Sequence, residues 1–353
     1  MNMDLNELFT EATRLDASDI HLIAGYPPML RLHGALVPLA GAAKLTQPET
    51  EQIILSSFNQ EQKDIFLTNK EIDFSLAANG ARFRSNVYYQ KNTIAADFRL
   101  ISEKIRSIDA LGLPAICHEF AKLRQGFVLV TGPTGHGKST TLAAMIASIN
   151  ATKPCHILTI EDPIEYIYPQ GLAVISQREM HQDTHSWSVA LRSALREDPD
   201  VVLIGEMRDL ETIGAALTVA ETGHLVFATL HTNSAAQTID RIVDVFPQNQ
   251  QAQIRLQLSS VLEGVVSQRL VPKIGGGRIA ITEILTSTPA LRTTIREGKT
   301  HLIDNIIQTS AELGMMTLET SLARAVREGL ISIEVASSYA LRPQELARLL
   351  KGP

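Results

Sequence analysis

One loop constrains the fold of this chain more than any other feature. Residues 132–139, GPTGHGKS, fit the phosphate-loop pattern G-x-x-x-x-G-K-[ST]. The apolar run Phe127–Thr131 before the loop predicts a strand that is buried on both faces. After the loop, apolar residues recur at the spacing of one helix face: Leu142, Met145, Ile146 and Ile149. A strand, a glycine-rich loop and an amphipathic helix in this order predict a nucleotide-binding unit.

The loop carries the groups that bind a nucleoside triphosphate. Its glycines allow backbone N–H groups to point at phosphate oxygens, and the following helix adds the positive end of its dipole. We expect Lys138 to reach the β- and γ-phosphates and Ser139 to offer its hydroxyl to Mg²⁺. The predicted ATP-binding residues are Gly132, Pro133, Thr134, Gly135, His136, Gly137, Lys138, Ser139 and Thr140.

His136 stands at a loop position that needs only its backbone N–H to bind phosphate. We therefore expect its side chain to point to solvent, and replacement by serine to change little. An alternative is that an imidazole near phosphate gains a proton and helps binding below about pH 6.5.

Composition and charge exclude several classes of protein. The 353 residues are enough for two domains, and no apolar run approaches the roughly 18 residues that span a bilayer. The N-terminal segment lacks the basic flank and apolar centre of a signal peptide, so we expect a reducing cytoplasm. Cys117 and Cys155 form neither a disulfide framework nor a metal site. A net charge of −6 without a basic block gives no footprint for nucleic acid, which favours protein partners.

Residues 1–101 predict a small α+β domain, followed by a polar linker at 102–112. Thr46 is the expected N-cap of a helix, and Asn79-Gly80 is the expected turn of an antiparallel hairpin. The predicted strands are Ile20–Ala24, Met29–Leu32, 72–76, 83–87 and Ile94–Ile101.

Residues 113–353 predict a second domain in which strands and helices alternate. The alternation implies a parallel sheet with helices on both faces. Beyond the phosphate loop and its helix, the expected elements are strand His156–Ile160, helix Ser186–Arg196, strand Val201–Ile204, helix Leu210–Thr222, strand Leu225–Leu230 and a helix capped by Ser234 and Gln237. A hairpin around Gly275–Gly277 and several short helices over 289–351 complete the chain.

Polar residues follow three of these strands, at the edge where α/β sheets bind ligands. Glu206 follows Val201–Ile204, where a carboxylate can orient the water that attacks the γ-phosphate. Gly205 stands where many phosphate-loop ATPases keep an acidic partner for Mg²⁺, so Glu206 is expected to serve both tasks. Glu161, Asp162 and Glu165 follow another strand, although as a bare pattern beside Pro163 they favour a solvated turn. His224 and His231 flank strand Leu225–Leu230, without a third residue at metal-ligand spacing.

These motifs together resemble a known family. The run LREDPDVVLIGEMRD at 195–209, with GPTGHGKSTT, LTIEDPIEY and ETGHLVFATLHT, is similar to the type IV pilus retraction ATPases, PilT-like members of the secretion and pilus ATPase superfamily. ASDIHL, RFRSN and GMMTLE match the family's landmarks nearer the two ends, so the resemblance covers nearly the whole chain. It implies an α/β protein with a PAS-like N-terminal domain, a RecA-like ATPase domain with C-terminal helices, and assembly into a ring-shaped homohexamer.

The resemblance also implies roles for particular residues. Glu161 and Glu165 would form an acidic box near Mg²⁺, and His224 and His231 a histidine box that senses the γ-phosphate. Charge that develops on the γ-phosphate calls for a cation, which an arginine can supply across a subunit boundary. Arg82, Arg84 and Arg99 on the N-terminal strands are the candidates, with the alternative that they are simply solvated surface residues. A helical motif would couple ring motion to pilus retraction without taking part in hydrolysis: Ala290, Leu291, Arg292, Ile295, Arg296 and Glu297.

That helix is expected to pack on its own domain through Ala290, Leu291, Thr294 and Ile295, with Arg292, Arg296 and Glu297 pointing outward. Three of its positions, Leu291, Thr293 and Thr294, differ from the family's A-I-R-N-L-I-R-E pattern, and His136 differs from the serine usual in its loop.

The function implied is a cytoplasmic hexameric ATPase that works with ATP and Mg²⁺ at the inner face of the bacterial inner membrane. Its expected partner is the inner-membrane platform protein of the pilus, through which alone it would contact the membrane, and a sister retraction ATPase is left open. The alternatives are a pilus assembly or type II/IV secretion ATPase, a RecA-like nucleic-acid motor, and a module that holds ATP without hydrolysing it. The first usually carries a longer N-terminal extension and a four-cysteine site, the acidic balance disfavours the second, and Lys138, Ser139 and Glu206 disfavour the third.

Overall fold

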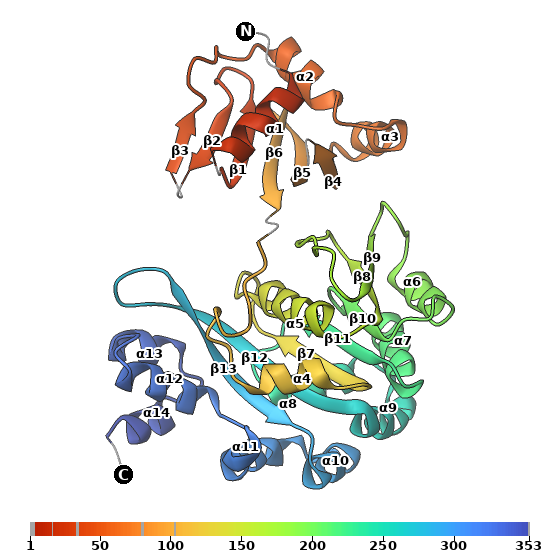
Figure 1. Ribbon diagram of the computed structural model, residues 1–353, viewed down its shortest axis with the longest axis vertical. Coiled ribbons are helices and arrows are strands. Elements are labelled where there is room, and N and C mark those ends of the chain that lie inside the picture. The colour runs from red at the N-terminus through yellow and green to blue at the C-terminus, as the bar shows by residue number, and fades with distance from the viewer. Residues whose placement is uncertain (1–3, 16, 33–34, 79–80, 102–103, 352–353) are drawn as a thin grey trace. The chain divides into compact units, whose positions relative to one another are not determined.

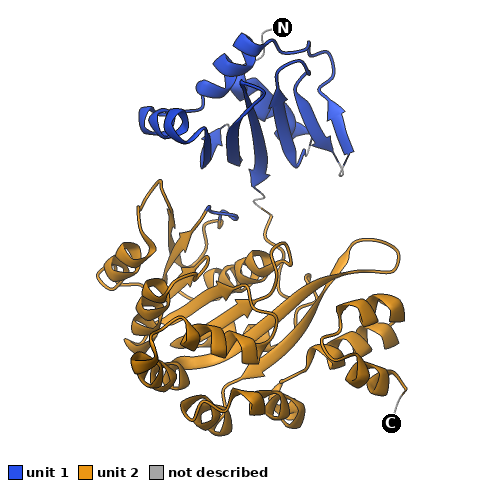
Figure 2. Cartoon of the chain, turned by 180° about the vertical axis from the view of Figure 1, so that it is seen from behind, with its two compact units in different colours: residues 1–103, 163–167 blue, residues 104–162, 168–353 orange. Residues whose placement is uncertain are grey.

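The chain divides into two units, which Figure 2 colours separately. Unit 1 comprises Met1–Glu103 and Pro163–Ile167, and unit 2 comprises Lys104–Asp162 and Tyr168–Pro353. The computed structural model describes residues 4–15, 17–32, 35–78, 81–101 and 104–351. The predicted α/β class is confirmed, with a smaller α+β unit first and helices last.

Unit 1 is built on a six-stranded antiparallel sheet with the order β3-β2-β1-β6-β5-β4 (Figure 1). Its strands are β1 (Asp19–Ile23), β2 (Met29–Leu32), β3 (Ala35–Pro38), β4 (Glu71–Ala78), β5 (Ala81–Gln90) and β6 (Thr93–Ile101). Strands β4 and β5 pair as predicted, while the predicted turn Asn79-Gly80 lies outside the described residues.

The helices of unit 1 are α1 (Leu5–Arg14), α2 (Gln47–Leu55) and α3 (Gln60–Asn69). They share one core with the inward residues of the sheet, where Phe9 of α1 stacks on Phe83 with 4.1 Å between ring centroids. Thr46 caps α2 as predicted, because its hydroxyl accepts from the N–H of Glu49 while the Glu49 carboxylate accepts from Thr46.

Unit 2 is built on a seven-stranded sheet with the order β13-β12-β7-β11-β10-β8-β9. All neighbouring strands are parallel except β12 and β13, which form the predicted hairpin. The strands are β7 (Gly126–Thr131), β8 (His156–Glu161), β9 (Val174–Glu179), β10 (Val201–Ile204), β11 (Leu225–Leu230), β12 (Leu262–Pro272) and β13 (Arg278–Thr286).

Helices cover both faces of this sheet, as predicted (Figure 1). Phe127 and Leu129 of β7 face one core, together with helices α6 (Trp187–Ala194), α7 (Leu210–Glu221), α8 (Ala235–Asp244) and α9 (Gln248–Val261). Val128 and Val130 face the opposite core, together with α4 (Ile116–Lys122) and α5 (Lys138–Thr152). The apolar run of β7 is therefore buried on both sides, which is why it shows no alternation.

The C-terminal helices follow the hairpin. They are α10 (Pro289–Arg296), α11 (Ile303–Thr309), α12 (Leu318–Arg327), α13 (Ile333–Tyr339) and α14 (Pro343–Leu350), with 3₁₀ turns at Thr300–Leu302 and Ala311–Leu313. Helices α10 and α11 join the larger core of the sheet. Helices α12 to α14 form a separate core on the outer part of the hairpin, around Val271 and Ile281.

Five elements have no counterpart among the elements expected from the sequence: β3, α3, α4, β9 and α9. Their patterns are weak, since β9 is an edge strand with mostly half-buried residues and α3 buries only Phe66. Within the predicted linker, Ile108 is buried in the core of unit 2. None of the helices that the structure describes combines the length and apolar content needed to cross a lipid bilayer.

Candidate active site

The phosphate loop connects the end of β7 to the start of α5 and lies beside β12. Strand β12 continues past the last residue of β7, so Gln268 stands next to the loop. At Gly132, where φ is +141°, a Cβ atom would lie 2.2 Å from the Gln268 carbonyl oxygen. At Gly137, where φ is +82°, it would lie 2.9 Å from the Gln268 side chain. Both backbone conformations favour glycine, and at Gly132 the backbone of the neighbouring strand excludes a side chain as well.

Lys138 occupies the first turn of α5 and is almost fully buried. Its Nζ donates to the carbonyl oxygens of Gly132 (2.9 Å) and Pro133 (3.1 Å). The ammonium group is thus held over the loop. A cation held over backbone N–H groups at a helix N-terminus is an arrangement that binds phosphate.

His136 does not point to solvent, so that prediction is wrong. Its Nδ1 accepts from the N–H of Leu270 (3.0 Å), and its carbonyl oxygen accepts from Nε2 of Gln268 (2.8 Å). Burial lowers the pKa of His136, and the positive charges of Arg269, Lys138 and Arg278 lower it further. The side chain is therefore neutral at neutral pH, which disfavours the alternative of an imidazolium that helps binding.

Glu206 directly follows β10 and its Gly205 neighbour, at the predicted strand end. Its Oε2 accepts from Nη2 of Arg208 (2.8 Å), and its Oε1 lies 2.9 Å from Nε2 of His231. Burial by itself would raise the pKa of Glu206, but the bond from Arg208 and the charges of His231, Arg208 and Lys138 lower it on balance. The carboxylate is therefore ionised at neutral pH.

His231 joins Glu206 to the phosphate loop. Its Nε2 faces Glu206, while its Nδ1 lies 3.3 Å from the hydroxyl of Thr134. The parallel register places the end of β11 beside the end of β7, which brings this histidine from a distant part of the sequence to the loop. The phosphate loop, His231 and Glu206, which belong to separate motifs of the sequence, thus meet at one edge of the sheet.

Glu161 ends β8 and is buried. Its Oε1 accepts from the hydroxyl of Thr159 (2.7 Å) and from Nε2 of Gln177 (3.2 Å). A Cβ atom on Gly205 would lie 3.2 Å from Cα of Glu161, so the glycine allows β8 and β10 to approach here. Glu165 is exposed and lies in Pro163–Ile167, which belongs to unit 1.

The remaining predicted residues are spread over other places. His224 precedes β11, at the opposite end of that strand from His231, and its Nδ1 lies 3.0 Å from both the Val219 carbonyl oxygen and the Thr222 hydroxyl. Within one chain, the two histidines are therefore not brought together. In unit 1, Arg99 donates from Nε to Asp19 (2.8 Å), Arg82 is half-buried on β5, and Arg84 is exposed.

Helix α10 spans Pro289–Arg296, one residue earlier at each end than the predicted segment 290–297, and Glu297 is its C-cap. Leu291, Thr294 and Ile295 are buried and Arg296 and Glu297 are exposed, as expected, but Ala290 is exposed rather than part of the apolar stripe. The expectation for Arg292 is also wrong. Its guanidinium donates to the carbonyl oxygens of Ser259 and Ser260 and to Glu263, so it binds the end of α9.

Gln268 was not among the residues predicted from the sequence, although its side chain supports the phosphate loop. Its Oε1 accepts from the hydroxyl of Thr141 in α5 (2.6 Å), and its Nε2 donates to His136. Ser267 likewise bonds Thr131 at the end of β7 (2.6 Å). The available signal was that the polar residues Ser267 and Gln268 directly follow the apolar pair Val265–Val266, in a strand that lies beside β7.

The chain is similar in sequence and in fold to several known proteins. Residues 1–276 match the family model described as "Type II/IV secretion system protein". The "Type IV pilus retractation ATPase PilT" of Pseudomonas aeruginosa is 50% identical over 343 residues, which cover 97% of this chain and 99% of that protein. A "Twitching motility protein" of Neisseria gonorrhoeae is 49% identical over 327 residues, covering 92% and 87%. The crystal structure of the pilus retraction motor PilT with bound ADP matches with a TM-score of 0.91 at 46% identity, covering 98% of this chain and 99% of that one.

Proposed function

Since the chain belongs to the type II/IV secretion system protein family, we propose that it hydrolyses ATP to power the retraction of type IV pili. The observation that carries the proposal is the link from Glu206 through His231 to Thr134 of the phosphate loop. A base candidate and a phosphate cradle are thereby held at one edge of the sheet. The similarity to PilT, over nearly the whole of both chains, supports retraction as the work performed.

In this proposal each side chain has one task in hydrolysis. Lys138 neutralises charge on the β- and γ-phosphates, for which its position over the loop prepares it. Glu206 is ionised and accepts a hydrogen bond from the attacking water once nucleotide displaces one of its present partners. His231 keeps Glu206 oriented, and its contact with Thr134 of the phosphate loop lets it respond to the presence of the γ-phosphate.

Mg²⁺ would be held by the hydroxyl of Ser139, with carboxylate oxygens of Glu206 and Glu161 close to the same edge of the sheet. This donor set fits the ion, which prefers one or two carboxylates together with phosphate oxygens. When bound, the ion neutralises part of the phosphate charge. Glu165 is proposed to belong to the acidic box near Mg²⁺, and His224 to the histidine box that senses the γ-phosphate.

The wider proposal is a ring-shaped homohexamer in the cytoplasm, docked on the platform protein at the inner face of the inner membrane. Arg82 and Arg99 would supply positive charge to the phosphate loop of the neighbouring subunit. Residues 1–101 and 113–353 would act as the two domains, joined by 102–112. Helix α10 would couple ring motion to the pilus.

Two substitutions test the catalytic part of the proposal. Lys138→Ala is expected to abolish turnover, because it removes the charge that positions the phosphates. Glu206→Gln is expected to bind ATP but to hydrolyse it on the order of 10²-fold more slowly, because an amide accepts a proton poorly. Nucleotide affinity and turnover are measured on purified protein. Near-normal hydrolysis by Glu206→Gln removes that residue from the proposed role.

A deletion in the source bacterium tests the direction of the work. Cells that lack this protein are expected to carry excess surface pili and to lose twitching. Complementation with the intact protein, but not with Glu206→Gln, should restore both properties. Bald cells would instead identify an assembly ATPase, and unchanged pili would place the protein in another secretion process.

A further inference from the structure

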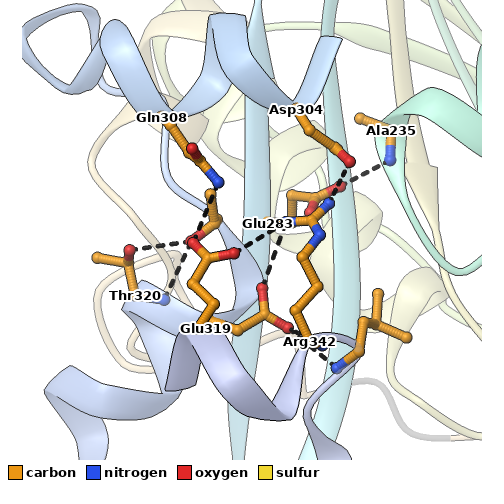
Figure 3. Close-up of polar contacts among 10 residues, drawn as sticks. Ala235, Glu283, Asp304, Gln308, Glu319, Thr320 and Arg342 are labelled. Atoms are coloured by element: carbon orange, nitrogen blue, oxygen red, sulfur yellow. Dashed lines mark hydrogen bonds and ion pairs between the residues drawn. The ribbon is translucent and has the colours of Figure 1, made fainter. Parts of the chain in front are cut away.

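A buried charged cluster lies between the β12–β13 hairpin and the C-terminal helices (Figure 3). Arg342, which precedes α14, lies among carboxylates from three other elements and from α14 itself: Glu283 of β13, Asp304 of α11, Glu319 of α12 and Glu345 of α14. The cluster thus holds more carboxylates than cations, and burying charge in this way is costly unless each group is well paired.

Glu283 is the member of the cluster that faces the nucleotide-binding edge. Only 1% of its surface is exposed, and its Oε1 accepts from the N–H of Ala235, at 2.8 Å. Its Oε2 has no hydrogen-bond partner among the described residues. Burial raises the pKa of Glu283 to about 7, against the lowering effects of the Ala235 bond and of Arg342, while Asp304 and Glu319 raise it further.

Ala235 is the first residue of α8, and its N–H is one of the groups that a helix start leaves without an internal partner. Glu283 therefore fixes the position of this helix start, with the helix dipole favouring its negative charge. His231 begins the short loop 231–234, which leads directly into Ala235. That loop is thus held at one end by Glu283 and at the other by the contacts of His231 with Glu206 and Thr134.

The opposite side of the cluster belongs to the C-terminal helices. Nη2 of Arg342 lies 2.5 Å from Oδ2 of Asp304, and Nη1 lies 3.5 Å from Oε2 of Glu319. Oε1 of Glu319 accepts from the backbone N–H groups of Leu341 (3.0 Å) and Arg342 (2.8 Å). Arg342 is thus the positive charge near Glu283, and its place depends on how α14 docks on α12.

We propose that Glu283 is a positioning residue for ATP hydrolysis, which holds the start of α8 so that His231 keeps its contact with Glu206. Arg342 balances the charge of Glu283, so that the docking of α14 reaches the active site through this carboxylate. The inference rests on the proposed roles of His231 and Glu206, and it concerns the catalytic step rather than nucleotide binding.

The test compares steady-state turnover of purified full-length variants. Glu283→Ala removes the acceptor for Ala235 and is expected to lower kcat about 10-fold with KM for ATP within about twofold. Glu283→Gln keeps an amide oxygen for the same bond and is expected to restore most of kcat. Glu328→Ala is the control, because it removes an exposed carboxylate outside the cluster, and its kcat is expected to stay within about twofold.

A further variant, which changes the donor of the same hydrogen bond, keeps the test valid if Glu283→Ala fails to fold. Ala235→Pro removes the N–H at the first helical position, which tolerates proline, and is expected to lower kcat as Glu283→Ala does. A double-mutant cycle tests the role of Arg342. In the wild-type background, Arg342→Met is expected to lower kcat about threefold. In the Glu283→Gln background it is expected to have no effect, because the glutamine has no charge to balance.

Unchanged kcat in both Glu283→Ala and Ala235→Pro overturns the inference, as does an equal loss in the control Glu328→Ala. A rise in KM without a change in kcat overturns it too, because the carboxylate would then act on nucleotide binding. Failure of the proposed function is recognised separately, since Glu206→Gln would then hydrolyse ATP normally whatever Glu283→Ala does.

Discussion

At the scale of single residues, His136 shows how a side chain of the phosphate loop takes part in the support of that loop. Its imidazole accepts from the backbone of β12, while its carbonyl oxygen accepts from Gln268. The bond to Leu270 needs the neutral ring with Nδ1 unprotonated. The lowered pKa of His136 keeps the ring in this form.

We therefore expect His136→Ser to weaken the loop. The serine hydroxyl is too short to reach Leu270, so the loss of one hydrogen bond should cost about 1 kcal/mol of stability and weaken ADP binding about fivefold. His136→Asn is the control, because its Oδ1 lies where Nδ1 does and can accept the same N–H. Calorimetric titration with ADP measures the difference.

The same titration, repeated at different pH values, checks the protonation state. Affinity of the wild type is expected to stay level as the pH falls through 6.5, because a ring with a lowered pKa remains neutral there. Affinity that rises on acidification, and rises less in His136→Asn, would show that the imidazolium binds phosphate after all.

Glu283 is the second residue with a measurable consequence, here for stability. Because its folded pKa of about 7 lies above the ordinary value of 4.5, the folded state binds more protons between these pH values. The stabilisation from this proton is complete below pH 4.5 and is lost as the pH rises through 7. Glu283→Gln carries no such proton, so its stability relative to the wild type should grow over this range by on the order of 3 kcal/mol.

Urea unfolding at a series of pH values measures this difference. The exposed Glu328→Gln replacement is the control, since it removes a carboxylate without touching the buried cluster. Parallel stability curves for Glu283→Gln and the wild type would show that Glu283 does not hold the extra proton.

At the scale of elements, the β12–β13 hairpin connects parts of unit 2 that are far apart in the sequence. Its inner half pairs with β7, and its outer half carries the core of α12 to α14. Along the same hairpin, Gln268 and Leu270 bond the phosphate loop, and Glu283 bonds the start of α8. A displacement of the C-terminal helices therefore acts on both sides of the active site through one element.

Helix α10 gives a prediction at this scale. Leu291 and Ile295 are each 1% exposed, so Leu291→Ala should leave a cavity and cost about 3 kcal/mol of stability. Arg296 and Glu297 are the exposed charged residues of the motif, so they are available to contact a partner. Replacing both with alanine is expected to leave ATP turnover and thermal stability near normal while pilus retraction is lost.

Twitching assays and turnover of the purified variant check this separation. Thr293→Ala, an exposed change on the same helix at a position that departs from the family, is the control and should keep motility. Retained motility in the Arg296→Ala/Glu297→Ala variant would remove α10 from the coupling, and a parallel loss of turnover would make its role structural.

At the scale of the whole molecule, the open question is whether unit 1 of one subunit completes the active site of another. Arg82→Ala/Arg99→Ala subunits keep an intact phosphate loop, and Lys138→Ala subunits keep intact arginines. Each variant alone is expected to have less than about a tenth of wild-type turnover, because each lacks charge at the γ-phosphate. Mixed rings are expected to recover activity, since some interfaces then combine an intact loop with intact arginines.

The control for this experiment is a mixture of Lys138→Ala with Glu206→Gln. Every subunit in this mixture carries a defect in its own unit 2, so no active site in a mixed ring is complete. Mixing should therefore restore no turnover beyond the sum of the two preparations. Equal recovery of turnover in both mixtures would show that mixing subunits raises turnover by itself, without arginines being shared between subunits. No recovery with the arginine variant would place Arg82 and Arg99 outside the site.

Much of unit 2 could be predicted because its patterns are local. Strands β10 and β11 have the bounds that their apolar runs predict, and α5 starts at Lys138 because the glycines before it allow the turn. Strand ends also predicted Glu206 and His231 at one edge, since neighbouring parallel strands end together. Periodicity failed where a side chain has a partner outside its own helix, as for Arg292 on the end of α9.

The sequence by itself determined the nucleotide loop, the alternation of strands and helices and the polar strand ends, because backbone conformation and apolar period depend on residues a few positions apart. Only the tertiary structure decided that His136 accepts from Leu270, that His231 contacts both Glu206 and Thr134, and that Glu283 holds the start of α8. Those contacts depend on strand order and on how far β12 extends beyond β7. Neither property is written in any local stretch of the chain, because both arise when distant segments bury their apolar faces together.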